Sequence, residues 1–164
     1  MIFITAGTTN FPFHRLERLV LSLCKLYPNK KFIFQISEVK EIFPEFVEIV
    51  SFLKPADFDN YLRTAEMVVS HAGYASVMKA LRYAKTKPIV MPRLKRYGEH
   101  VNDHQLYFAR LMHKKGLISL VREKGSVNQV ISNNKYEPVK VKNYLKEVDT
   151  RRASLTKYLI SITR

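Results

Sequence analysis

The sequence predicts an α/β protein in which helices flank a Rossmann-like parallel sheet. Two observations predict this class. Short apolar runs alternate along the chain with segments of helical periodicity, which is the pattern of βαβ units. The 164 residues suffice for one domain with its own core and are few for two, and the 46% hydrophobic and 26% charged content is typical of a globular chain.

The first half of the chain alternates predicted strands with predicted helices. The strands are predicted over residues 2–6, 31–36 and 46–52. Apolar residues recur at helical spacing from Leu16 to Cys24, and Pro28 ends that helix. A shorter helix is predicted to begin with Asp57 as its N-cap and to run to Arg63.

The second half continues the alternation. The strands are predicted over residues 67–70, 88–91 and 117–121. The helices are predicted over residues 75–83, over 101–115 with Gly116 as the stop, and over 127–131 with Ser126 as the cap. Residues 133–138 are interpreted as a linker. We therefore expect a Rossmann-like domain over residues 1–134 and a basic C-terminal tail over residues 135–164, with a weakly amphipathic helix over 141–163.

Charge is the unusual property of the composition. A net charge of +14 implies an anionic partner, which can be nucleic acid, an anionic membrane surface or a phosphorylated ligand. An acidic partner subunit or a lysine-rich proteome would explain the charge equally well. The single cysteine, Cys24, excludes an intrachain disulfide and suits a reducing cytoplasm. No apolar run approaches the roughly 18–20 residues that span a bilayer, and residues 1–5 are interpreted as a strand and not as a signal peptide.

Polar segments follow three of the predicted strands, at residues 7–10, 70–76 and 92–105. Parallel strands joined by right-handed crossovers end at one edge of the sheet, and open α/β sheets bind their ligands at that edge. We therefore expect these segments to form one site. The third segment combines basic, imidazole, carboxylate and amide groups, which predicts an anionic ligand that is rich in hydroxyls.

Glycines give the first two segments the form of anion-binding turns. The backbone around Gly7 and the hydroxyls of Thr8 and Thr9 can hold a phosphate at a helix N-terminus, although a tight turn that needs glycine explains Gly7 equally well. Gly73 lets the backbone approach a ligand, and Ser76 can donate to a diphosphate. Neither segment has the spacing of a dinucleotide-binding turn, a P-loop or a serine hydrolase.

The third segment has rival interpretations. His100 and His104 are four residues apart with Asp103 beside them, so they share a face and can bind zinc if a helix begins at Glu99. A helix N-terminus held by Asn102 or Asp103 is the structural alternative. Ligand hydrogen bonding is the interpretation that we favour.

Residues 1–13, 70–73 and 92–105 together resemble the C-terminal, donor-binding half of GT-B glycosyltransferases. The resemblance covers about residues 1–121, and the run Gly-Glu-His-x-x-Asp-His-Gln at residues 98–105 is quite specific. The members of this family that the sequence resembles most are small stand-alone subunits. One group transfers sugars in bacterial capsule and exopolysaccharide assembly, and the other is the eukaryotic catalytic subunit that adds the second N-acetylglucosamine to a dolichol-diphosphate-linked sugar.

The resemblance implies a function and a partner. Such subunits bind a UDP-sugar, and the sugar passes to a lipid-diphosphate-linked acceptor. A membrane-associated partner subunit supplies the acceptor-binding half, so the chain would be cytoplasmic and held at the cytoplasmic face of a membrane. No metal or other cofactor is expected, because helix dipoles and hydrogen bonds stabilise the leaving diphosphate. No nucleic-acid partner is expected.

The resemblance also implies site residues. Those expected to bind the donor are Gly7, Thr8, Thr9, His71, Gly73, Ser76, Arg93, Asp103, His104 and Gln105. The members in the two glycine turns would lie near the diphosphate or the interdomain cleft, and the last three would contact the donor sugar. Glu99 and His100 are the candidates for catalysis, although the catalytic base can also belong to the partner.

Two positions depart from the pattern of these relatives. Lys79 occupies a position where they commonly have a glutamate that binds the ribose hydroxyls, and lysine has no acceptor. His14 occupies a position that is often acidic. These departures leave open a second function, that of a non-catalytic subunit that stabilises or activates a partner transferase. Nucleic-acid binding is a third hypothesis with less support, because the sequence contains no recognised module.

Overall fold

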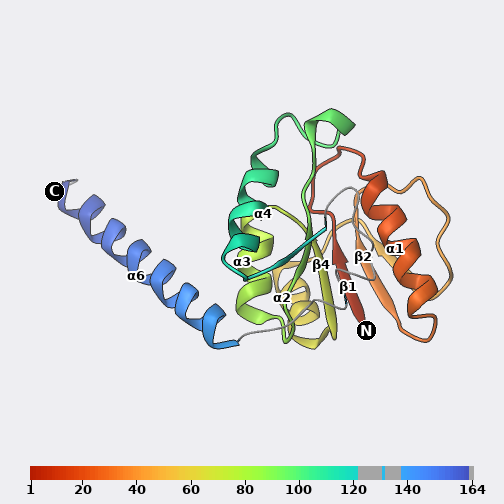
Figure 1. Cartoon of the computed structure of the whole chain (residues 1–164), viewed down its shortest axis with the longest axis horizontal. Helices are drawn as coiled ribbons and strands as arrows, with labels where there is room; N and C mark the ends of the chain where they lie inside the picture. Colours follow the sequence, from red (N-terminus) through yellow and green to blue (C-terminus); the bar gives the residue numbers. More distant parts are fainter. Residues whose placement is uncertain (122–130, 132–137, 163–164) are drawn as a thin grey trace.

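Six parallel strands form one sheet in the order β3-β2-β1-β4-β5-β6 (Figure 1). The computed structural model describes residues 1–121, 131 and 138–162. The strands are β1 (Ile2–Thr5), β2 (Phe32–Gln35), β3 (Val47–Val50), β4 (Met67–His71), β5 (Ile89–Met91) and β6 (Ser119–Leu120). The predicted Rossmann-like class is confirmed. Strand order reverses between β1 and β4, and this topological switch point is where such sheets bind ligands.

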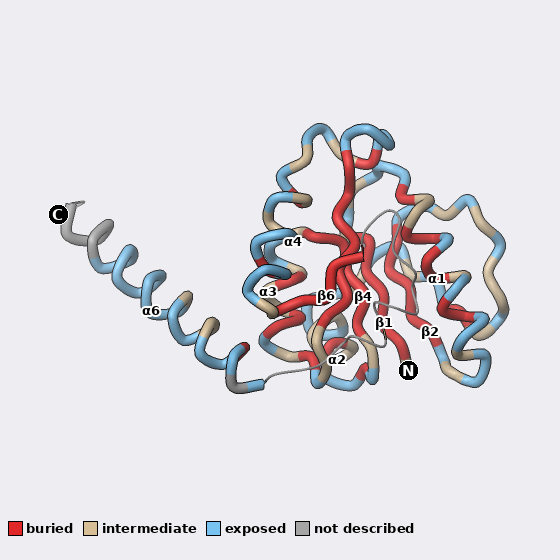
Figure 2. The backbone as a smooth tube through the Cα atoms, viewed as in Figure 1, coloured by how far each residue is buried: buried red, intermediate tan, exposed pale blue. Residues whose placement is uncertain are grey.

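The central strands of the sheet are largely buried (Figure 2), and their alternate residues belong to different layers of the core. In β1, Ile2 and Ile4 pack with α1 (His14–Leu26), whereas Phe3 packs with Leu62 of α2 (Pro55–Thr64). Every residue of β1 and β2 is buried, as parallel strands covered on both faces require. β3 lies at the edge, is shorter than the predicted run over residues 46–52, and exposes Glu48.

Two helix starts were predicted wrongly. α2 begins at Pro55, not at an Asp57 cap, because proline is preorganised for the first helical position, and Asp57 lies inside the first turn. α4 (His104–Lys114) begins at His104 and not at residue 101. The residues before it form a short 3₁₀ turn, η1 (Lys95–Tyr97), and a loop in which Asp103 accepts a 2.8 Å hydrogen bond from the Lys95 N–H.

Two further helices, α3 (Tyr74–Tyr83) and α4, contribute residues to one buried cluster. α3 packs against α2 and β4, and α4 packs against β6. α6 (Pro138–Ile162) extends away from the sheet (Figure 1). Near its start, Val141 is buried in the cluster that α3 and α4 share, and Asp149 pairs with Arg82 of α3 at 2.8 Å. Further along α6, Leu155 is exposed.

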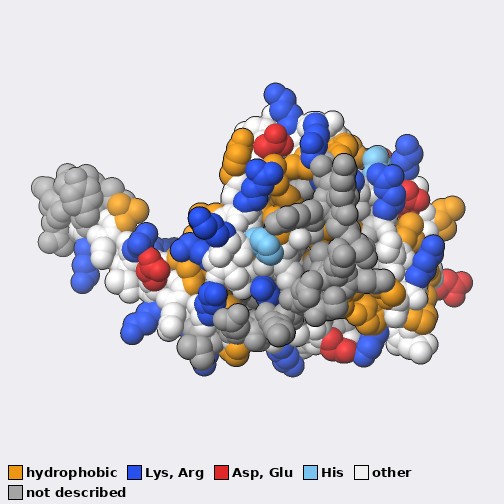
Figure 3. All heavy atoms as spheres, in the orientation of Figure 1, with side chains coloured by type: hydrophobic (Ala, Val, Ile, Leu, Met, Phe, Trp, Pro, Cys, Tyr) orange, Lys and Arg blue, Asp and Glu red, His pale blue; other side chains and the backbone are white. Residues whose placement is uncertain are grey.

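Several sequence predictions concern residues outside the described ranges. These are residues 127–130 of the predicted helix 127–131, residues 133–137 of the predicted linker, and the boundary at 134. Within the described ranges, no helix combines the length and the apolar character needed to cross a bilayer. Lys and Arg side chains spread over the face drawn in Figure 3, whereas Asp and Glu side chains are sparse there, in keeping with the net charge of +14.

Candidate functional site

A cavity of about 420 Å³ lies at the switch point of the sheet, where β1 and β4 end. The turn after β1 contributes Gly7, Thr8 and Thr9 to its lining. The end of β4 and the first turn of α3 contribute His71, Gly73 and Ser76, with Tyr74 and Ala75 between them. The structure therefore brings together the six residues that the sequence predicted in the two glycine turns.

His71 lies between the two glycines. It is the last residue of β4 and is buried, with 7% of its surface exposed. Gly7 has φ +80°, and a Cβ atom there would lie 2.7 Å from His71 Nε2. A Cβ atom at Gly73 would clash with the same nitrogen. Both positions must be glycine as long as the imidazole stays in this place.

The His71 imidazole is neutral at physiological pH. Burial, and then the positive charge of Arg93, lower its pKa from 6.5 to about 4. Its Nδ1 lies 3.4 Å from the Thr5 carbonyl, which can only accept, so we assign the proton to Nδ1. Nε2, on the side of Gly7 and Gly73, is then an acceptor. The imidazole thus places no positive charge in the cavity and can accept a hydrogen bond there.

The N-terminus of α3 supplies donors to the cavity. Gly73 is the N-cap, and no side chain of the described residues caps the helix. The first intrahelical bond from this end is that of the Val77 N–H to the Gly73 carbonyl. The N–H groups of Tyr74, Ala75 and Ser76 precede it and have no acceptor in the part of the chain that the structure describes, and the helix dipole adds partial positive charge beside them. This end of the cavity suits an anion.

Lys79 also lines the cavity, and its charge is partly compensated. Its Nζ lies 2.6 Å from Asp59 Oδ1 and 5.6 Å from the centre of the Phe58 ring. Asp59 and Phe58 belong to α2, so this pair joins α2 to α3 at the rim of the site. The position where relatives commonly have an anionic side chain is therefore cationic here.

Arg93 does not line this cavity, but its guanidinium forms hydrogen bonds to the loops at the edge of the cavity. It is 1% exposed, and its Nη1 donates to the carbonyls of Phe11 (2.8 Å), Pro12 (3.2 Å) and Glu99 (3.3 Å). Its Nη2 donates to the Ala6 carbonyl at 2.9 Å. Burial lowers the pKa of Arg93 to about 10, partly offset by Glu99. The residue joins the loop after β1 to the loop after β5.

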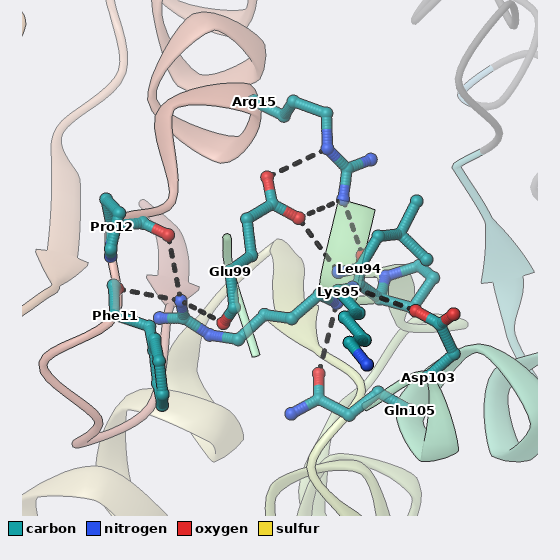
Figure 4. A network of polar contacts seen from close by, with 10 residues as sticks. Phe11, Pro12, Arg15, Leu94, Lys95, Glu99, Asp103 and Gln105 are labelled. Carbon is teal, nitrogen blue, oxygen red and sulfur yellow. Dashed lines mark hydrogen bonds and ion pairs between the residues drawn. The ribbon is translucent and has the colours of Figure 1, made fainter. Parts of the chain in front are cut away.

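Glu99, like Arg93, forms hydrogen bonds that join two parts of the chain. Its carboxylate, which is buried, accepts hydrogen bonds from Arg15 Nε at 2.9 Å and from the Leu94 N–H at 2.9 Å (Figure 4). Arg15 also donates to the Pro92 carbonyl at 2.8 Å. The carboxylate thus joins α1 to the loop after β5, and this geometry favours a positioning role for Glu99 over a role in proton transfer.

The other predicted residues of this loop lie outside the described lining of the cavity. Asp103 accepts from the Lys95 N–H, and the buried Gln105 accepts a 3.2 Å hydrogen bond from the Arg93 N–H. His104 is exposed. The structure gives these side chains contacts within their own loop, and their contact with a donor sugar stays a prediction.

The two histidines of this loop lie side by side. The His100 and His104 rings meet edge to face with centroids 4.6 Å apart, and His100 stacks on Phe11 at 5.7 Å. Partial burial, and then His104, lower the pKa of His100. The described residues contain no group of three potential metal ligands, so the zinc interpretation has no third ligand. Asn102 Oδ1 accepts from the His104 N–H at 3.2 Å, as the helix-capping alternative predicted.

Sequence reasoning missed one wall of the cavity. Gln35 at the end of β2, and Leu53, Pro55 and Phe58 around the start of α2, complete the lining. A signal for them was present, because β2 and β3 end at the same edge of the sheet as β1 and β4. Leu53, Pro55 and Phe58 lack the polar groups that drew attention to the other loops, and Gln35 lies within the predicted strand over residues 31–36 and not in a polar segment after a strand.

Residues 1–157 match the profile of the glycosyltransferase family 28 C-terminal domain. Among solved structures, the chain is similar to the crystal structure of the glycotransferase of kitacinnamycin, with a TM-score of 0.67 and 15% sequence identity over 96% of this chain. The chain spans 42% of the length of that protein. A search among curated proteins finds no match.

Proposed function

Because the chain belongs to the glycosyltransferase family 28 C-terminal domain family, we propose that it is the donor-binding part of a sugar transferase and that it binds a UDP-sugar. The observation that carries the proposal is the convergence of two glycine turns and the open N-terminus of α3 on one cavity. Its volume of about 420 Å³ is within the range of small-molecule sites. A diphosphate is the anion that the backbone donors suit.

The same donors serve the transfer chemistry that we propose. The acceptor hydroxyl attacks the anomeric carbon of the sugar, and the bond from that carbon to the diphosphate oxygen breaks with its electrons passing to the oxygen. The N–H groups of Tyr74, Ala75 and Ser76 are fixed before the reaction, so they stabilise the negative charge as it grows without reorganisation. His71 stays neutral and buried, and in this proposal it accepts a hydrogen bond and transfers no proton.

The acceptor half belongs, in this proposal, to a membrane-associated partner subunit. The resemblance of residues 1–121 to small stand-alone subunits supports this part of the proposal, and the described residues form a single six-stranded Rossmann-like sheet. The net charge of +14 suits a nucleotide donor, a lipid-diphosphate acceptor and an anionic membrane face. The partner then also supplies the catalytic base. We expect the isolated chain to bind UDP but to transfer little or no sugar.

A second candidate function is that of a non-catalytic subunit, and Lys79 favours it. Its ammonium pairs with Asp59 and cannot accept hydrogen bonds from ribose hydroxyls. The two functions differ in nucleotide affinity, because a donor-binding subunit must bind UDP and a stabilising subunit need not.

Isothermal titration of UDP into the purified chain, with and without the candidate partner, separates the two functions. Saturable UDP binding supports the donor-binding function. If the wild-type chain fails to bind UDP but the variant Lys79→Glu/Asp59→Asn binds it, the cavity is intact and Lys79 prevents nucleotide binding. That result supports the non-catalytic function. If neither binds even with the partner present, the proposed function is wrong.

A further inference from the structure

A second cavity, of about 610 Å³, lies between α4, β6 and the loop after β5. Its described lining has no residue in common with the cavity at the switch point. The basic residues that line it are Arg15, Arg96, Arg110, His113 and Lys114. The described lining contains no acidic side chain. The remainder is apolar, so the cavity has a hydrophobic floor with cations around it.

One face of α4 forms much of this cavity. Leu106, Arg110, His113 and Lys114 are spaced along the helix so that they lie on the same side. Ala109 and Met112 of the same helix are buried in the core. Arg110, His113 and Lys114 on the basic side of α4 are exposed in the described structure, so they can contact a ligand.

Two of these cations have no counter-charge among the described residues. Arg15 pairs with Glu99, and His113 Nδ1 lies 3.2 Å from the Ile118 carbonyl. Arg110 and Lys114 are exposed, and neither forms an ion pair within the part of the chain that the structure describes. They lie one helical turn apart beside an apolar surface. An anion that entered the cavity would neutralise both.

We propose that this cavity binds a phosphate group carried on an apolar chain. A guanidinium and an ammonium four residues apart suit the oxygens of a phosphate monoester or diphosphate. Leu106, Leu120 and Val121 would cover the first part of the apolar chain, which removes that surface from water. Free phosphate would leave this floor unused. The site is separate from the nucleotide site, and its existence does not depend on the proposed donor function.

The probe for this proposal is dioctanoyl phosphatidic acid, titrated calorimetrically into the chain below its micelle concentration and at fixed ionic strength. Dioctanoyl phosphatidylcholine, which has the same chains, and inorganic pyrophosphate, which has none, are the comparison ligands. The variant Arg110→Gln/Lys114→Gln removes the two unpaired cations. Arg152→Gln/Lys157→Gln, on the exposed part of α6, removes the same two residue types and is the matched control.

The proposal predicts that phosphatidic acid binds more tightly than either comparison ligand. The α4 variant should weaken its binding by about ten-fold or more, since each lost charge-assisted hydrogen bond has about that effect, and the α6 control should change it less than two-fold. UDP binding should be equal in both variants. Equal weakening by the two variants would show non-specific attraction to a basic protein and overturn the proposal. Competition between UDP and phosphatidic acid, or pyrophosphate binding as tightly as the lipid, would overturn it as well.

Discussion

The guanidinium of Arg93, in the loop after β5, donates a 2.9 Å hydrogen bond to the carbonyl of Ala6, at the end of β1. The two residues are 87 positions apart, and β4 lies between their strands in the sheet. Gly7, which follows Ala6, lines the candidate nucleotide cavity. One buried side chain thus determines where the first glycine turn lies relative to the rest of the site.

Replacement of Arg93 by lysine should destabilise the fold by about 2–4 kcal/mol. Lysine keeps the charge, but a single ammonium cannot reach the carbonyls of Phe11, Ala6 and Glu99 together, and a buried carbonyl left without a donor is costly. Urea denaturation monitored by circular dichroism measures the change. Arg18→Lys on the exposed side of α1 is the control, and a loss no larger than that of the control would contradict the role assigned to Arg93.

Glu99→Gln should lower the free energy of unfolding by about 3 kcal/mol, because it leaves Arg15 without its charged partner in a largely buried place. The double variant Glu99→Gln/Arg15→Met should recover part of that loss. Thermal and urea denaturation of the three proteins provide the comparison. If Glu99→Gln keeps full stability and instead abolishes sugar transfer by the assembled enzyme, Glu99 takes part in the chemistry and the positioning role is wrong.

The stability of the protein should fall below pH 6.5 because of His71. The unfolded chain protonates this residue near pH 6.5, whereas the folded chain resists protonation until about pH 4. Between about pH 6.5 and pH 4, the unfolded state therefore binds a proton that the folded state does not. The contribution of His71 to the free energy of unfolding is fully present above pH 6.5 and is lost as the pH falls through this range. The expected loss between pH 6.5 and 5 is about 2 kcal/mol.

The variant His71→Asn isolates that contribution, because His100 also has a lowered pKa and adds to the same slope. The variant should show a shallower dependence of unfolding free energy on pH between 6.5 and 5. Parallel curves for the wild type and the variant would mean that folding does not lower the pKa of His71.

The start of α6 should contribute to the stability of the domain and its exposed part should not. Val141 is 4% exposed in the core cluster of α3 and α4, so Val141→Ala should cost about 2 kcal/mol. Leu155 is 57% exposed, and Leu155→Ala should change the unfolding free energy by no more than about 0.5 kcal/mol. Chemical denaturation of the two variants tests the difference, and similar effects would contradict it.

The strands and the two glycine turns could be predicted because their signals are local. A short run of mostly apolar residues, such as residues 31–36, predicts a buried strand by itself. A glycine directly before a predicted helix predicts a tight turn by itself. The roles of Asp103 and Gln105 could not be predicted this way. Asp103 accepts from the backbone N–H of Lys95, and Gln105 accepts from the backbone N–H of Arg93. The sequence does not show these contacts, because they depend on the backbone conformation of the loop.

The α2 wall of the cavity shows a second kind of failure. Phe58 and Leu53 are apolar, and apolar residues near a predicted helix are indistinguishable in sequence from core residues. The structure places them at the cavity, beside the start of α2 at Pro55, which is three residues before the first helical residue that an Asp57 cap implies.

UDP binding to two glycine variants tests the central claim most directly. Gly7 and Gly98 both have positive φ, +80° and +67°, so alanine strains the backbone at both, but only at Gly7 would the new Cβ meet His71. Calorimetry should show that Gly98→Ala keeps wild-type UDP affinity and that Gly7→Ala weakens it at least ten-fold. Equal UDP affinity in both variants, or no UDP binding by the wild-type chain with its partner, would contradict the account.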